Sequence, residues 1–152
     1  MHLEEVIAFS SLKSSRNFRI VSQEGCVLGP VAFHEFHGEL IDLSERDIIV
    51  KSIGNSNALL LENHGFLTCG ETIEAAFLRA FFFVFEINTQ LLINNQNDSN
   101  ISRPTPAAIA KSVKQSVGEI SGGSGPSMES DLFWKFGKLD WEAWMRSLDD
   151  LV

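Results

Sequence analysis

One run of apolar residues constrains this chain more than any other feature. Residues 73–93, IEAAFLRAFFFVFEINTQLLI, contain five phenylalanines but also carry Glu74, Arg79 and Glu86. A membrane span needs about 20 predominantly apolar residues, and central charges disfavour insertion. We therefore interpret the run as a buried helix of a soluble protein. An apolar row with helical spacing predicts that this helix is the central packing element; the row comprises Ile73, Phe77, Phe81 and Phe85.

Two short apolar runs precede this helix and indicate paired strands. Residues 58–61 and 66–69 flank the tripeptide Asn63-His64-Gly65. Asn and Gly accept positive φ, so the sequence predicts a strand, a tight turn and a return strand. The first run has no polar alternation, which indicates that helices cover both faces of its strand.

Weaker patterns predict the remaining elements. We expect a helix within residues 2–13, a short helix at 22–28, a strand at 31–33 and a helix from Ser44 to Gly54. Residues 94–130 are rich in Asn, Ser, Gly and Pro, which predicts a flexible linker with a weak helix at 106–117. The three tryptophans lie in residues 131–152, so this tail should form a helical segment that docks on the domain.

Charge and cysteine content exclude some classes of function. The chain has 20 acidic and 12 Lys or Arg residues, a formal net charge of −8, and no basic stripe. Nucleic-acid binding needs clustered cations, so it is disfavoured. Cys26 and Cys69 lack a C-x-x-C partner and a neighbouring cation, so we expect buried, inert thiols. With no secretory signal pattern, these features indicate a reducing cytosol.

Histidines are the main candidates for metal or acid–base chemistry. His34 and His37 form H-x-x-H, but nothing nearby supplies a third ligand. We favour backbone hydrogen bonding over a metal site for that pair. His64 lies at the predicted turn, where a side chain projects from a rigid sheet end. The local pattern leaves its role open between a functional residue and a structural one.

Three motifs together resemble a known family. Residues 58–77, ALLLENHGFLTCGETIEAAF, look like the class II aldolase/adducin family. Residues 29–42, GPVAFHEFHGELID, resemble the adducin branch, with Phe33 and Phe36 where tyrosines are usual. Residues 134–151, WKFGKLDWEAWMRSLDDL, are similar to another adducin segment. The resemblance covers about two thirds of the chain and has no match in residues 94–130.

The resemblance implies a fold and an incomplete active site. We expect a layered α/β/α class II aldolase-like domain with a mixed β-sheet, N-terminally truncated, in which residues 1–93 form a partial head domain. Catalytic members hold zinc with a His-x-His pair and a later Asn-His-Gly histidine. His64 matches the third ligand and His2 the second, whereas the first ligand, the acidic residue and the phosphate-binding loops have no counterpart here. We therefore predict a vestigial metal site at His2 and His64, no catalytic residues, no cofactor and no aldolase activity.

The resemblance also implies partners, and two alternatives stay open. Adducin-like proteins assemble the actin–spectrin skeleton, so we expect self-association or pairing with adducin-like subunits, a cytoplasmic and cytoskeletal location, and peripheral contact with the inner face of the plasma membrane. The first alternative is a zinc-dependent aldolase or epimerase acting on sugar phosphates, incomplete in this chain. The second is a nonfunctional partial copy that folds poorly and exposes strand edges.

Overall fold

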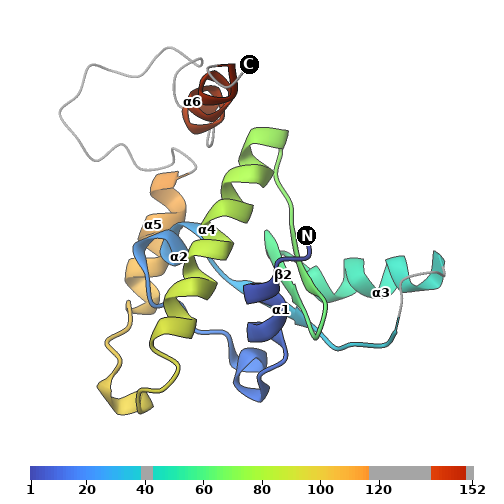
Figure 1. Ribbon diagram of the computed structural model, residues 1–152, viewed down its shortest axis with the longest axis vertical. Coiled ribbons are helices and arrows are strands. Elements are labelled where there is room, and N and C mark those ends of the chain that lie inside the picture. Colours follow the sequence, from blue (N-terminus) through green and yellow to red (C-terminus); the bar gives the residue numbers. More distant parts are fainter. Residues whose placement is uncertain (39–42, 117–137, 150–152) are drawn as a thin grey trace.

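The computed structural model in Figure 1 describes residues 1–38, 43–116 and 138–149. The N-terminal part contains α1 (Glu4–Ser10), the 3-10 helix η1 (Lys13–Asn17), α2 (Gln23–Leu28), β1 (Val31–His34) and α3 (Leu43–Ile53). It continues with β2 (Ala58–Leu61), β3 (Gly65–Thr68), α4 (Ile73–Leu92), η2 (Asp98–Asn100), α5 (Pro106–Ser116) and α6 (Lys138–Asp149). The predicted elements are therefore present, with bounds that shift by a few residues.

A three-stranded mixed sheet forms the middle layer. The strand order is β1-β2-β3, with β1 parallel to β2 and β2 antiparallel to β3. All four residues of β2 are buried, which confirms that both faces of this strand are covered. Helices α1 and α4 pack on one face of the sheet, and α3 contacts β1 and β2 from the other side (Figure 1). The predicted layered α/β class is confirmed.

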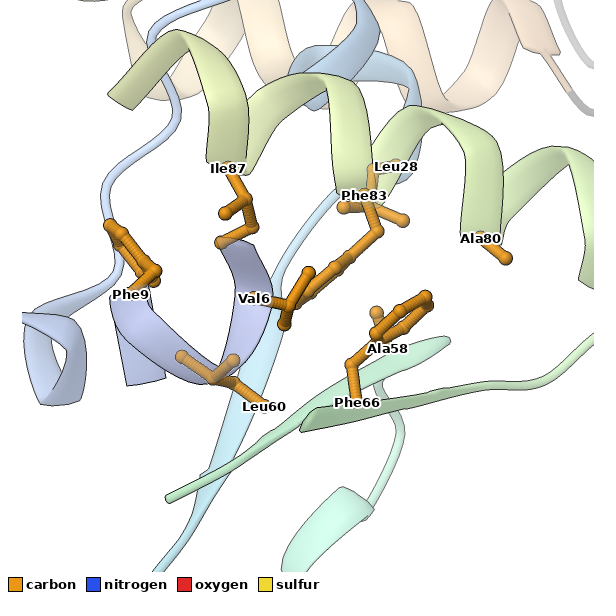
Figure 2. Packing of buried hydrophobic residues seen from close by; sticks show 9 residues of the cluster. All are labelled: Val6, Phe9, Leu28, Ala58, Leu60, Phe66, Ala80, Phe83 and Ile87. Atoms are coloured by element: carbon orange, nitrogen blue, oxygen red, sulfur yellow. The ribbon is translucent and has the colours of Figure 1, made fainter. Parts of the chain in front are cut away.

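The core lies between α4 and the sheet, as Figure 2 shows. Phe83 of α4 stacks on Phe66 of β3, with ring centroids 4.7 Å apart and an interplanar angle of 10°. Val6 and Phe9 of α1 and Leu60 of β2 close the same cluster. Fully burying one such side chain contributes roughly 1.5–3 kcal/mol, so this cluster is the main source of stability among the described residues.

The prediction of which face of α4 packs inward is wrong. The row expected in the core is outermost: Ile73 is 75% exposed, Phe81 49% and Phe85 45%. The inward face instead carries Ala80, Phe83 and Ile87. The helix has apolar residues around most of its circumference, so spacing alone selects no face. By length and composition α4 could also cross a membrane, but here one face packs on the sheet.

Two charged side chains of α4 point inward and have partners there. Glu86 is fully buried and accepts hydrogen bonds from the backbone N–H groups of Val21 (2.8 Å) and Ser22 (3.0 Å). Arg79, 8% exposed, donates to the carbonyl of Cys69 at 2.7 Å. A buried charge is tolerated only where donors or acceptors compensate it, so these partners fix the rotation of α4 about its axis.

The C-terminal half contains the helix predicted at 106–117. This helix, α5, lies within the predicted linker 94–130 and packs against α2. Residues 117–130 of that linker lie outside the described residues, as do residues 131–137 with Trp134. Helix α6 lies against α4 through Trp141 and Trp144. Cys26 is buried as expected, whereas Cys69 is exposed, because it follows β3 at the surface.

Candidate functional site

The candidate site lies where two parallel strands end at one edge of the sheet. β1 ends at His34, which is in register with Leu61 at the end of β2. Parallel strands place their carboxyl ends at the same edge, so His34 meets the turn that follows Leu61. In that turn Asn63 has a φ of 54° and Gly65 a φ of 147°. The predicted strand, turn and return strand are confirmed.

The N-terminal residues run along the outer edge of β3 and place His2 on His64. The Met1 ammonium donates to the Phe66 carbonyl at 2.7 Å, and the Phe66 N–H donates to the Met1 carbonyl at 3.1 Å. Gly65 permits this approach, because a Cβ there would lie 2.2 Å from the Met1 carbonyl oxygen. The His2 and His64 rings stack with centroids 4.6 Å apart and an interplanar angle of 15°.

A small cavity of about 90 Å³ lies beside this pair, bounded by the described residues of β1, the turn and α3. His34 lines it, with Nδ1 2.9 Å from the Ser52 hydroxyl. The His34 ring also meets the His37 ring edge to face at 5.5 Å. Burial, and then the neighbouring His37, lower the pKa of His34. The His-x-x-His residues therefore pair with each other and with a hydroxyl at the cavity wall.

A carboxylate in the turn is held by two donors. Glu62 accepts the Phe36 backbone N–H at 3.1 Å and an Arg16 guanidinium N–H at 2.8 Å, and its own N–H donates to the His34 carbonyl. Arg16 also pairs with Glu35. The Phe36 hydrogen bond, and then Arg16, lower the pKa of Glu62. A carboxylate whose pKa is lowered is a weak base, so Glu62 is poorly suited to accept a proton.

Comparison with known proteins shows which family this chain belongs to. The family model for the class II aldolase and adducin N-terminal domain matches residues 1–91. The chain belongs to the class II aldolase/adducin family. The resemblance seen in its motifs is therefore confirmed.

Similar curated proteins are adducins and adducin-related proteins. Adducin-related protein 1 of Caenorhabditis elegans is 33% identical over 149 residues, which cover 98% of this chain and 20% of that protein. Alpha-adducin of Rattus norvegicus is 35% identical over 135 residues, which cover 86% of this chain and 18% of that protein. The chain thus spans about one fifth of the length of these relatives.

Solved structures show the same fold among class II aldolases. An aldolase II superfamily protein from Pseudomonas syringae aligns with a TM-score of 0.73 and 28% identity, over 98% of this chain and 54% of that chain. L-fuculose 1-phosphate aldolase from Glaciozyma antarctica PI12 aligns with a TM-score of 0.59 and 26% identity, over 73% of this chain and 40% of that chain.

The two histidines that the resemblance matches to zinc ligands, His2 and His64, lie together with their ring centroids 4.6 Å apart. Within residues 1–38, 43–116 and 138–149, no three His, Cys, Asp or Glu side chains form a metal-binding group.

Sequence reasoning missed the charged residues around the turn. Glu62 directly precedes Asn63-His64-Gly65, and that adjacency is a signal that could have singled it out. No sequence pattern singles out Arg16 or Glu35, because only the folded chain brings Arg16 to both Glu62 and Glu35. Glu45 also lines the cavity, with a buried Oε2 that has no hydrogen-bond partner among the described residues.

Proposed function

We propose that this chain is a non-catalytic, adducin-like protein of the actin–spectrin membrane skeleton that acts by self-association or by pairing with adducin-like subunits. The observation that carries the proposal is its similarity to adducins, at 33–35% identity over 86–98% of the chain. The proposed location is the cytoplasmic cytoskeleton, with peripheral contact at the inner face of the plasma membrane.

The geometry of the turn supports a role without catalysis. Class II aldol chemistry requires a metal that stabilises developing enediolate charge, together with a nearby base. Among the described residues no third His, Cys, Asp or Glu side chain joins His2 and His64, and Glu62 is held as a weak base.

Co-sedimentation with filamentous actin, with and without spectrin, tests the proposed skeletal function. We expect the chain to pellet with filaments when spectrin is present, above a control that lacks filaments. Because the net charge is −8, we expect little pelleting with filaments alone. Background pelleting under both conditions would refute the actin–spectrin role.

The second candidate function is a zinc-dependent aldolase, favoured by one observation. His64 and His2 correspond to family zinc ligands and are in contact. Titration calorimetry with zinc and a sugar-phosphate turnover assay distinguish the two candidates. We expect no submicromolar binding and no turnover. Turnover that disappears in His64→Ala but persists in the matched variant His37→Ala would instead assign this chain to the enzymes.

A further inference from the structure

A larger cavity lies at the C-terminal end of α4. Its volume is about 280 Å³, and it is bounded by residues 9–21 on one side and residues 90–103 on the other. It shares no lining residue with the cavity beside the turn, and α6 contacts α4 at Phe77, near the opposite end of the helix. Figure 1 shows this end of α4 at the bottom, where η2 follows it. The cavity is therefore separate from the histidines and from α6.

Two arginines and one aspartate are the charged residues that line this cavity within the described part of the chain. Arg19 and Arg103 outnumber Asp98, so the wall carries one excess positive charge, in a chain whose net charge is −8. We name this space the arginine cavity. Because the local charge is opposite in sign to that of the whole chain, the cavity is a place to which an anion is attracted.

Both guanidinium groups converge on the Asp98 carboxylate. Arg19 donates through Nη1 to Oδ2 at 2.8 Å, and Arg103 donates through Nη2 to Oδ1 at 2.6 Å. Asp98 begins the short helix η2, and its side chain is 66% exposed. A carboxylate of the chain itself thus shows that the two arginines can hold one oxyanion between them, at a point that solutes can reach.

Arg103 keeps a donor that Asp98 does not use. An Arg side chain has five N–H donors in a planar fork that matches the oxygens of a carboxylate or a phosphate. The buried Nε–H of Arg103 has no hydrogen-bond partner within the described parts of the chain. A buried donor without a partner is unfavourable. Because Arg103 lines the arginine cavity, a ligand oxygen that enters it supplies this arginine with a further acceptor.

The rest of the wall suits the organic part of a ligand. It combines amide side chains with apolar ones, namely Asn17, Asn94, Gln96, Phe9, Val21 and Ile93. Small-molecule sites usually consist of apolar surface with a few polar groups that fix orientation. A bare inorganic ion would leave these groups unused, so the arrangement favours an anionic group attached to a small organic body.

We propose that the arginine cavity binds a small organic anion whose carboxylate or phosphate group takes the place of Asp98 between Arg19 and Arg103. The anionic group accepts hydrogen bonds from both guanidinium groups, and the organic part lies against the amide and apolar walls. Exposed ion pairs contribute little free energy, so turning the Asp98 side chain toward solvent costs little. Asp98 and the ligand therefore compete for the same two donors.

Titration of the isotope-labelled full chain, followed by NMR, tests the inference at low ionic strength, where exposed charges are least screened. The probes are benzoate and phenyl phosphate, which carry the two anionic groups on the same ring. Benzamide is the uncharged control of similar shape, and inorganic phosphate is the anion without an organic part. We expect both aromatic anions to shift the Nε–H signals of Arg19 and Arg103 and to bind about tenfold more tightly than either control. The tighter of the two identifies the anionic group that the cavity prefers.

Substitutions in the arginine cavity should act in opposite directions. Arg19→Gln and Arg103→Gln should each raise the dissociation constant about tenfold, because each removes a charged donor. Asp98→Asn should instead lower the dissociation constant, since the competing carboxylate is lost. Arg46→Gln is the matched control and should change nothing, because Arg46 is exposed on α3 and does not line the cavity.

Circular dichroism verifies that the variants fold, and the exposed Arg19 keeps the test valid if Arg103→Gln does not. If the two aromatic anions bind no better than benzamide, the anion site is refuted. If inorganic phosphate binds as tightly as phenyl phosphate, the cavity takes a bare ion and the proposed organic ligand is wrong. If Asp98→Asn weakens binding, the three charged side chains only hold residues 98–103 in place, and the proposal is overturned. None of these outcomes bears on the proposed actin–spectrin role.

Discussion

Glu86 gives the sharpest test of how α4 is fixed in this fold. Its Oε1 accepts the Val21 N–H at 2.8 Å and the Gln90 side-chain amide at 2.8 Å. Its Oε2 accepts the Ser22 N–H at 3.0 Å and the Ser22 hydroxyl. The Ser22 hydroxyl in turn accepts the Gly25 N–H and caps α2. One buried carboxylate thus ties α4 to the start of α2.

Replacing Glu86 with Gln keeps the shape and removes one acceptor. If the Gln oxygen takes the Oε1 position, its NH₂ group faces the Ser22 N–H, and this donor loses its partner. An unsatisfied buried donor costs about 1–3 kcal/mol, and hydrogen bonds weaken when their acceptor loses its charge. Removing the buried charge offsets part of this loss. We expect Glu86→Gln to lower the free energy of unfolding by about 3 kcal/mol.

Urea unfolding measures this effect. With an m-value of about 1–3 kcal/mol/M, the midpoint should fall by roughly 1–3 M. Asp47→Asn is the control, because it removes the same charge from an exposed position on α3 and should change stability by at most about 0.5 kcal/mol. Equal midpoints for Glu86→Gln and Asp47→Asn would refute the argument that this carboxylate holds α2 on α4.

A double-mutant cycle with Gly25 tests the same contact independently. A Cβ on Gly25 would lie 2.3 Å from Oε2 of Glu86. Gly25→Ala alone should therefore destabilise the fold by about 1–3 kcal/mol, because the carboxylate must move. The same substitution should have a smaller effect in Glu86→Ala, where the clash is gone. Additive effects would contradict the contact.

Three further predictions concern the core, the turn and a buried histidine. Phe83→Ala should lower the free energy of unfolding by about 3–5 kcal/mol, and Leu92→Ala, 86% exposed on the same helix, by less than about 1 kcal/mol in denaturant unfolding. Gly65→Ala should lower the thermal unfolding midpoint and shift the His64 ring signals in NMR spectra, because the new Cβ displaces Met1. Gly54→Ala is the control. Gly54 has a φ of 53° and open space around it, so this substitution should leave the His64 signals unchanged. Burial lowers the pKa of His34, so below pH 6.5 the unfolded chain binds more protons than the folded chain. The free energy of unfolding should therefore decrease as the pH is lowered below 6.5. An unchanged dependence of this free energy on pH in His34→Gln would contradict the prediction.

Local chemistry made several elements predictable. Asn63 and Gly65 accept positive φ, so the turn between β2 and β3 could be located from sequence. The unbroken apolar run of β2 correctly indicated burial on both faces. The motifs around the turn also identified the family, because they combine several residue types at fixed spacing.

The candidate site was predictable only in part. His64 could be placed by its turn, and His2 was matched to it through the family resemblance. Their ring stacking, however, depends on Met1 pairing with Phe66, a contact between residues 65 positions apart. The Arg16 contacts with Glu62 join residues 46 positions apart. No local pattern encodes such contacts, so only the folded chain brings these groups together.

The sequence by itself determined that residues 73–92 form a helix, because apolar residues recur there at helical spacing, which is a local property. Only the tertiary structure decided which face of that helix is buried. Two apolar faces compete for the core, and spacing does not rank them. Glu86 and Arg79 need partners once they leave water, and those partners lie just before α2 and just after β3. That requirement turns Phe83 inward and leaves Phe81 and Phe85 at the surface.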